Sequence, residues 1–269
     1  MQPTLLKLAV LGYVCATGLA LTHLAQRKEL VYRLAALATL GGWICHTLAL
    51  VVLGVERGRP PLGSLPEAVS MAAWVVVLLE MALERQYGLK VLGAFVLPIV
   101  LMLTLRGAAR PLALGSIGPA LGSTWVWVHV ALALIGIAAF VLNFAGAIMY
   151  LLQEHQIKVK RPGAFYYRLP ALETLDRLTY QTLALGFPFL TTGLILGAVS
   201  APTSWGTVLP LDPLAILSLL AWVIYAATLA GRAAAGWHGR RAAYCAIAGF
   251  AALVVTLGAG LFLPGRHGS

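Results

Sequence analysis

The chain has 269 residues, of which 60% are hydrophobic and only 10% are charged. A soluble domain carries about a quarter charged residues, so this composition excludes an ordinary soluble enzyme and predicts a membrane protein. The net charge of +10 would suit a nucleic-acid-binding protein, but the basic residues lie in short intervals between long apolar segments. We therefore interpret the charge as a topology signal and expect a lipid bilayer, with no nucleic acid, as the surroundings of the chain.

Apolar segments long enough to cross a bilayer follow one another along the whole chain. A helix needs about 20 apolar residues to span the hydrocarbon core, and backbone groups in lipid must satisfy their hydrogen bonds internally. The predicted helices are Thr4–His23, Leu34–Val55, Leu65–Leu83, Leu89–Leu105, Trp125–Leu152, Tyr180–Ala201, Leu214–Gly231 and Ala242–Leu263. The sequence therefore predicts an all-α membrane protein, a bundle of about eight transmembrane helices that forms a single integral membrane domain over residues 1–269.

The positions of lysine and arginine predict the orientation of this bundle. If the N-terminus is outside, thirteen of the 19 Lys and Arg residues fall on the cytoplasmic side and six on the other. Positive residues favour the cytoplasmic side, so both termini are predicted outside. The longest polar interval, about 154–178, is then a cytoplasmic loop. Its leucines at 169, 172, 175 and 178 favour an amphipathic helix on the inner surface.

One motif inside a predicted helix concerns packing. Gly193 and Gly197 form a GxxxG pattern in the sixth apolar segment. Small residues at this spacing allow a neighbouring helix to approach closely. The motif by itself indicates no function.

Familiar catalytic motifs are absent from the sequence. There is no nucleophile–base pattern, P-loop, HExxH motif or CxxC pair, and without a CxxCH motif the chain is not itself a c-type cytochrome. The cysteines Cys15, Cys45 and Cys245 are isolated in apolar segments and are interpreted as buried small residues. No catalytic residue is predicted, and these motifs do not identify the chain as an enzyme.

Two histidines from distant parts of the chain are predicted at the outer surface. His129 lies one turn inside the outer end of the fifth segment, after Trp125 and Trp127, and His267 follows the eighth segment. Ionisable residues in a membrane are functional candidates, and two imidazoles can ligate an iron porphyrin from opposite sides. The alternative is that both are ordinary interfacial histidines.

Other polar candidates lie in the N-terminal half. His46 is about 20 Å from the cytoplasmic end of its helix, where it could bond a neighbouring carbonyl or take part in haem or proton handling. Arg57 and Arg59 are predicted outside, where guanidinium groups could bind haem propionates in two-point geometry or simply anchor the helices. Glu67 is predicted at a similar depth and could pair with these arginines.

Seven short segments carry a family resemblance through their order and spacing. They are RGRPPLGSLPEA (57–68), LGAFVLP (92–98), WVWVHV (125–130), LPALETLDRL (169–178), LGFPFLTTGLILGAV (185–199), GWHGRRAA (236–243) and LPGRHGS (263–269). With these segments the chain resembles the CcsA-type cytochrome c assembly proteins, a haem-handling membrane family that includes the CcsA, CcmC, HemX and YpjD branches.

The resemblance implies a ligand, a partner and a location. It implies non-covalent haem b with His129 and His267 as axial ligands of the iron, and delivery of haem to apocytochrome c outside the cytoplasm. It also implies a bacterial plasma membrane, with a CcsB-type membrane partner. The candidate contacts to haem are Trp125, Trp205, Asp212, Arg57, Arg59 and His46, with Trp205 and Asp212 in a loop at about 202–213 that corresponds to the family's haem platform.

The sequence also departs from the family pattern. Leu209 and Leu211 replace two tryptophans of the platform loop, Ala215 replaces its acidic residue, and Ala230 stands where the CcsA branch has a further histidine. A membrane regulatory protein similar to HemX or YpjD, without haem delivery, is therefore the alternative hypothesis. A small-solute transporter that uses His46 and Glu80 is a third.

Overall fold

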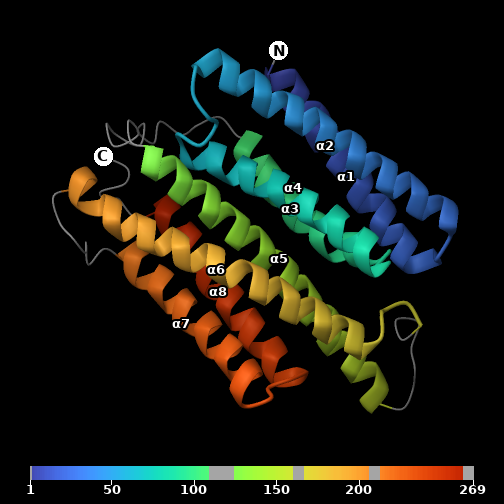
Figure 1. Cartoon of the computed structure of the whole chain (residues 1–269). Helices are drawn as coiled ribbons and strands as arrows, with labels where there is room; N and C mark the ends of the chain where they lie inside the picture. The colour runs from blue at the N-terminus through green and yellow to red at the C-terminus, as the bar shows by residue number, and fades with distance from the viewer. Residues whose placement is uncertain (1, 109–123, 160–166, 206–212, 263–269) are drawn as a thin grey trace. The chain divides into compact units, whose positions relative to one another are not determined.

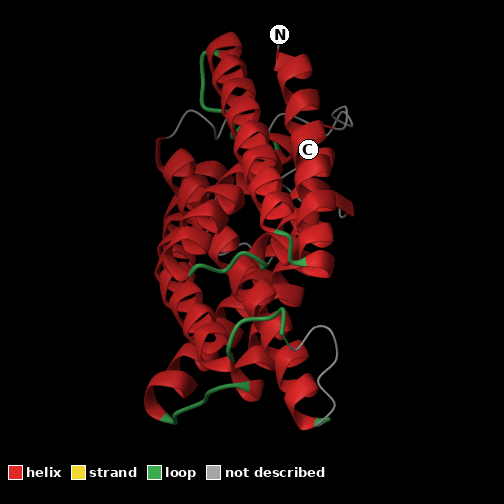
Figure 2. Ribbon diagram, turned by 90° about the vertical axis from the view of Figure 1, so that its right-hand side faces the viewer, coloured by secondary structure: helices red, strands yellow, loops and turns green. Residues whose placement is uncertain are grey.

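The computed structural model describes residues 2–108, 124–159, 167–205 and 213–262. Within these ranges the chain forms eight α-helices and no strand (Figures 1 and 2). The helices are α1 (Gln2–Gln26), α2 (Glu29–Arg57), α3 (Leu65–Tyr87), α4 (Leu92–Ala108), α5 (Thr124–Lys158), α6 (Leu172–Trp205), α7 (Pro213–Ala234) and α8 (Arg240–Phe262). Each overlaps one predicted helix, and six of them are long and apolar enough to cross a membrane. The prediction of an all-α, multi-pass membrane protein is confirmed.

The segment between α5 and α6 differs from the prediction. Because α5 continues to Lys158 and α6 begins at Leu172, the connection is shorter than the predicted loop of 154–178. The predicted surface helix is wrong, since Leu175 and Leu178 are fully buried in the first turns of α6. Gly146 of α5 explains their burial, because without a side chain it allows Leu178 to pack directly against that helix.

The chain divides into two compact units, and each is described by itself. Unit 1 contains Met1–Arg110 and Leu152–Thr174, and unit 2 contains Pro111–Leu151 and Leu175–Ser269. The single domain expected from the sequence remains a prediction.

Small residues bring α1 and α2 of unit 1 into close contact along their length (Figure 1). A methyl group added at Gly12 would lie 2.7 Å from the Cα atom of Gly42, so only glycine permits this crossing. Between α2 and α3, the Trp43 and Trp74 rings stack with centroids 5.3 Å apart. The Trp74 indole N–H donates to Thr47 Oγ1 at 2.7 Å, which leaves that buried polar group satisfied.

The turn from α2 to α3 has capping groups at both ends. Gly58 ends α2 in the left-handed region with φ of 61°, a conformation that glycine adopts without steric cost. Ser64 caps α3, since its hydroxyl accepts the backbone N–H of Glu67 at 3.4 Å. Pro66 in the first turn has no N–H group to leave unsatisfied. These caps hold Glu67 and the arginines of the turn at one end of unit 1.

Unit 2 is an antiparallel arrangement of α5, α6, α7 and α8. Its apolar core contains Phe140, Leu183, Leu190, Ala221, Tyr225 and Leu253. The Phe140 and Tyr225 rings stack at 3.7 Å and tie α5 to α7. A methyl group at Gly136 would lie 3.2 Å from the backbone nitrogen of Leu190, so α5 and α6 also pack with their backbones close together.

Polar contacts connect the helices of unit 2 at the end where α6 begins. Asp176 accepts a hydrogen bond from Arg232 Nη2 at 2.8 Å and one from the backbone N–H of Gly239 at 3.0 Å. These bonds join the start of α6 to the end of α7 and to the turn before α8. Because the helices alternate in direction, the start of α5, the end of α6, the start of α7 and the end of α8 meet at the opposite end of the unit.

Candidate functional site

The topology of unit 2 brings three of the sequence-predicted site residues, Trp125, His129 and Trp205, to one end. Trp125 lies in the first turn of α5, and Trp205 is the last residue of α6. Asp212 directly precedes α7 and His267 follows the end of α8 by five residues, and both lie outside the described residues. The predicted cluster therefore depends on His129, whose side chain the structure describes at this same end.

The His129 ring contacts α6, 64 residues further along the chain. Its Nδ1 lies 2.5 Å from the carbonyl oxygen of Gly193. A carbonyl oxygen can only accept a hydrogen bond, so the contact requires a proton on Nδ1. In the neutral ring the lone pair is then on Nε2. Histidines that ligate metals are commonly arranged in this way, with the second nitrogen donating to a carbonyl or a carboxylate.

The GxxxG motif provides the space for this ring. A methyl group at Gly197 would lie 3.0 Å from Cε1 and 3.2 Å from Nδ1 of His129. Gly193 faces Ala133, one turn after the histidine, with its nearest atom 3.5 Å from such a methyl group. The close approach predicted from the motif is confirmed, and the structure adds that the side chain lying against it is His129.

A second polar group lies at the turn between α2 and α3 of unit 1. Arg59 binds Glu67 through two hydrogen bonds, of 2.9 and 3.2 Å, and Arg57 forms an ion pair with the same carboxylate. The backbone N–H of Gly63 donates to Glu67 at 2.8 Å. Burial and the charge of Arg57 lower the pKa of the Arg59 guanidinium. Two guanidinium groups therefore contact one carboxylate at this turn.

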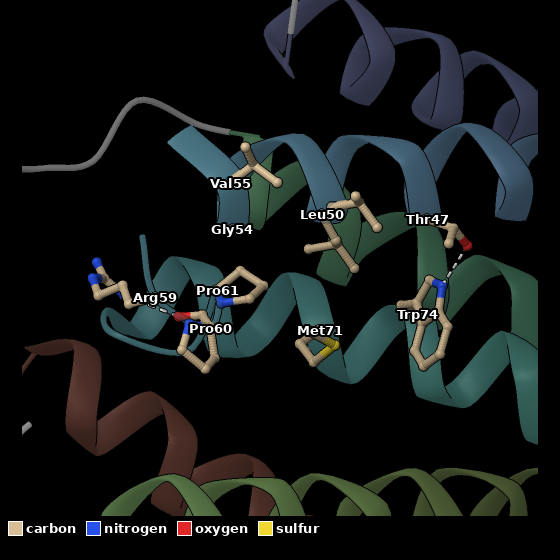
Figure 3. A pocket seen from close by; sticks show the side chains of 10 residues that line it. Thr47, Leu50, Gly54, Val55, Arg59, Pro60, Pro61, Met71 and Trp74 are labelled. Carbon is tan, nitrogen blue, oxygen red and sulfur yellow. Dashed lines mark hydrogen bonds between the residues drawn. The ribbon is translucent and has the colours of Figure 1, made fainter. Parts of the chain in front are cut away.

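Arg59 also lies at one end of an apolar pocket of about 440 Å³ (Figure 3). Trp74 lies at the other end, where its indole N–H bonds Thr47. The remaining lining comes from α2, α3 and their connecting turn: Leu50, Val51, Gly54, Val55, Pro60, Pro61 and Met71. Arg59 supplies the charge among the lining side chains, so the pocket suits an apolar group that ends in an anion.

His46 has the most enclosed position of the candidates, with no exposed surface. Its Nδ1 lies 3.2 Å from the Tyr13 hydroxyl of α1, and its Nε2 lies 2.9 Å from Ser70 Oγ of α3. A methyl group at Gly107 of α4 would lie 2.8 Å from the Cβ atom of Ser70, so all four helices of unit 1 meet near this ring. Both nitrogens of His46 are engaged, in contrast to those of His129.

Sequence reasoning did not identify the partners of these histidines. Tyr13 and Ser70 are single polar residues in apolar segments, and nothing local marks them as partners of His46. Gly193 had a signal in the GxxxG spacing, but its functional contact is a backbone carbonyl, which every residue possesses. Only the packing of α5 on α6 shows that this carbonyl faces His129.

Comparison with known proteins places the chain among relatives of this architecture. The model of the family described as Cytochrome C assembly protein matches residues 62–265. The chain belongs to this family. The matched region covers α3 to α8 and includes Trp125, His129, Trp205 and Asp212, whereas His267 lies two residues beyond its end.

Curated relatives match this cytochrome c assembly protein over most of its length. It is 31% identical over 250 residues to the cytochrome c biogenesis protein CcsA of Guillardia theta, covering 86% of this chain and 83% of the relative. It is 30% identical over 267 residues to CcsA of Parasynechococcus marenigrum, covering 90% and 86%. The chain is therefore a CcsA-type membrane protein of cytochrome c biogenesis.

A solved structure supports the fold of this assembly protein. The cytochrome c haem lyase CcmF superposes with a TM-score of 0.68 at 17% identity, covering 96% of this chain. The chain spans 46% of the length of that lyase. The similarity shows a shared helical fold, and the lyase activity belongs to the longer protein.

Proposed function

We propose that this membrane protein binds haem b non-covalently at the outer face of a bacterial plasma membrane and presents it for attachment to apocytochrome c. His129 and His267 are the proposed axial ligands of the haem iron. Family membership supports a role in cytochrome c biogenesis. The single observation that carries the proposal is the hydrogen bond from His129 Nδ1 to Gly193, since it leaves Nε2 as the ligand nitrogen.

The His129 imidazole at this end of unit 2 is a donor that fits haem iron. A neutral imidazole with its second nitrogen fixed by a carbonyl is a common axial ligand, and His267 supplies the second imidazole in the proposal. Trp125, Trp205 and Asp212 are the proposed wall of the site, and their positions in the chain at the ends of α5, α6 and α7 support this assignment. When bound, haem supplies the vinyl groups that form thioether bonds with the cysteine thiols of apocytochrome c.

Residues of unit 1 have proposed roles as well. Arg57 and Arg59 are proposed to bind the haem propionates, since guanidinium groups bind carboxylates in two-point geometry, as Arg59 does with Glu67. His46 is assigned to the packing of unit 1 and not to iron, because ligation would break its bond to Tyr13 or Ser70. A CcsB-type membrane partner completes the proposed assembly.

An absorption spectrum of the detergent-purified chain, oxidised and reduced, tests the proposal. The variants are His129→Ala and His267→Ala. The matched control is His238→Ala, since His238 is exposed and its Nδ1 also bonds a carbonyl, that of Gly236 at 2.6 Å. His238 lies at the opposite end of unit 2. This control therefore shows whether a histidine with the same kind of hydrogen bond contributes to haem binding when it lies outside the proposed site.

The wild type and His238→Ala are expected to show the same low-spin haem spectrum. Each of the other two variants should lose haem or give a high-spin spectrum, because one axial ligand is missing. A wild type that binds no haem after reconstitution would overturn the proposal and favour the regulatory alternative. An unchanged spectrum in His129→Ala would remove that residue from the site.

A further inference from the structure

We infer that Gly193 and Gly197 of α6 form a seat that positions His129 for haem, with the Gly193 carbonyl as a positioning group that tunes the ligand. The inference rests on the proposed function and extends it to α6, which holds none of the proposed ligands. It gives the GxxxG motif a role in the chemistry of the bound group, in addition to helix packing.

The carbonyl of Gly193 selects the ring nitrogen that faces the ligand. The Nδ1–O distance of 2.5 Å is short for a hydrogen bond from a nitrogen, and the acceptor belongs to the rigid backbone of another helix. With the proton held on Nδ1, the lone pair stays on Nε2 and the ring cannot turn over without losing the bond. The seat therefore fixes both the tautomer and the orientation of the imidazole before haem arrives.

Gly197 provides the volume that the ring occupies. The nearest atoms to a methyl group at this position are Cε1, Nδ1 and Nε2 of His129, at 3.0, 3.2 and 3.7 Å. Cβ atoms rarely approach other atoms as closely as 3.0 Å, so alanine would push the ring away from Gly193. The methyl group would therefore lengthen or break the bond to the carbonyl, whereas its distance of 3.7 Å to the ligand nitrogen Nε2 is an ordinary contact.

Gly193 differs from Gly197 in what a side chain would meet. A methyl group at Gly193 would lie 3.5 Å from the backbone nitrogen of Ala133 and 3.7 Å from its Cα, which are ordinary contacts. The carbonyl belongs to the backbone and remains in alanine. Two substitutions of the same chemistry, four residues apart on one helix, therefore separate the effect on the ring from the effect on the helix.

Helix association alone explains these glycines less completely. At Gly136 of α5 the neighbours are backbone atoms of α6, since a methyl group would lie 3.2 Å from the Leu190 nitrogen and 3.3 Å from the carbonyl oxygen of Gly186. At Gly197 the neighbour is a side chain, and that side chain is the proposed ligand. A motif that served only packing would place backbone or small residues there.

The seat also affects the redox behaviour of bound haem. An imidazole whose Nδ1–H donates to a carbonyl has a more electron-rich Nε2, so it stabilises ferric over ferrous iron. Loss of this hydrogen bond should therefore raise the midpoint potential. It should also weaken haem binding by about 10- to 100-fold, the usual effect of removing a group that orients a metal ligand.

The test compares Gly197→Ala with Gly193→Ala as its matched control. A third variant, His129→Nδ1-methylhistidine, keeps Nε2 but cannot donate from Nδ1. Haem affinity and midpoint potential are measured by optical titration in detergent. In the haem-free protein, ¹⁵N NMR of labelled histidine reports the tautomer of His129. The His129 signal is identified as the one that is missing from the spectrum of His129→Gln. Thermal unfolding of every variant provides a readout for packing.

We expect Gly197→Ala and the methylhistidine variant to bind haem about 10- to 100-fold more weakly and at a higher potential. Gly193→Ala keeps the carbonyl and its methyl group meets only ordinary contacts, so it should weaken haem binding less than Gly197→Ala does. If both alanine variants lost haem affinity equally, with matching decreases in thermal stability, the motif would serve helix packing alone and the inference would be overturned. An unchanged affinity and potential in the methylhistidine variant would also overturn it.

The haem-free protein separates this inference from the proposed function. Suppose the wild type binds no haem but carries the His129 proton on Nδ1, and Gly197→Ala alone loses this tautomer. The positioning role of the glycines is then supported, and the proposed haem binding is overturned. If every variant binds haem as the wild type does, haem binding is supported and the positioning role of the glycines is overturned.

Discussion

Two histidines in apolar helices, one in each unit, show how differently the same side chain can be used. His46 of unit 1 has no exposed surface and bonds the Tyr13 and Ser70 hydroxyls, one at each nitrogen. His129 of unit 2 is partly buried and bonds one carbonyl, that of Gly193. A ring with two side-chain partners joins three helices, whereas a ring with one backbone partner keeps a nitrogen for a ligand.

The comparison shows that depth in the membrane is a poor guide to function by itself. The costly position is that of His46, and its cost is offset by hydrogen bonds within the protein. The position of His129 is less enclosed, and its hydrogen bond at Nδ1 orients the ring while Nε2 stays available for a ligand. The number of engaged ring nitrogens therefore distinguishes the structural histidine from the candidate ligand.

Replacement of His46 should have the largest effect on stability. His46→Ala removes a buried ring and leaves two buried hydroxyls without their partner, so we expect a loss of about 2–4 kcal/mol in the free energy of unfolding. Unfolding in mixed detergent measures the loss, and the haem content of the folded fraction is expected to match the wild type. Loss of haem at normal stability would instead make His46 a ligand.

Glu67 extends the comparison to a buried carboxylate. Glu67→Gln keeps the shape of the side chain but leaves Arg57 and Arg59 without a counter-charge, and both are partly exposed and can rehydrate. We expect a loss of about 1–2 kcal/mol in the free energy of unfolding. If the loss comes from repulsion between the two arginines, added salt should reduce it by screening their charges. Chemical denaturation at two ionic strengths measures it. An unchanged stability would show that the arginines do not need this carboxylate.

The two bonds of His46 can be separated in a double-mutant cycle. Tyr13→Phe and Ser70→Ala should each cost about 0.5–1.5 kcal/mol, since hydrogen bonds between membrane helices have modest net energies. Because both hydroxyls bind one ring, their effects should be coupled by about 0.5 kcal/mol or more. Strict additivity of the two losses would contradict a single shared centre.

His129 should have the smallest effect on stability and the largest on haem. His129→Ala removes a partly buried ring with one hydrogen bond, so the haem-free protein should lose about 1 kcal/mol or less. Thermal unfolding of the haem-free variants of His129 and His46, measured side by side, checks this order. If His129→Ala proved as destabilising as His46→Ala, both rings would be structural and the comparison would fail.

Most of the fold was predictable because a bilayer imposes strong rules on a sequence. Each of the eight apolar segments overlaps one helix, since lipid allows no other way to satisfy a spanning backbone. The boundary between α5 and α6 was less predictable. Leu175 and Leu178 have a helical spacing that suits a surface helix equally well, and only the tertiary structure shows that both are buried, Leu178 against Gly146.

The candidate site was predictable in part. Trp125 and His129 were assigned to one surface from topology and Trp205 was assigned from the family resemblance, and the described helices bring these positions to one end of unit 2. The pairing of Arg59 with Glu67 followed from their predicted depth. The hydrogen bonds of His46 were not predictable, because Tyr13 and Ser70 are distant in sequence and have no distinguishing local pattern.

The sequence by itself determined that this protein is a multi-pass helical bundle of the cytochrome c assembly family. Hydrophobic segment length and motif order are properties of the chain alone, so they could be read without coordinates. Only the tertiary structure decided which nitrogen of each histidine is engaged, because that depends on which atoms of another helix lie within hydrogen-bond distance. The carbonyl of Gly193 is chemically identical to every other carbonyl in the chain, and its position against His129 gives it a role.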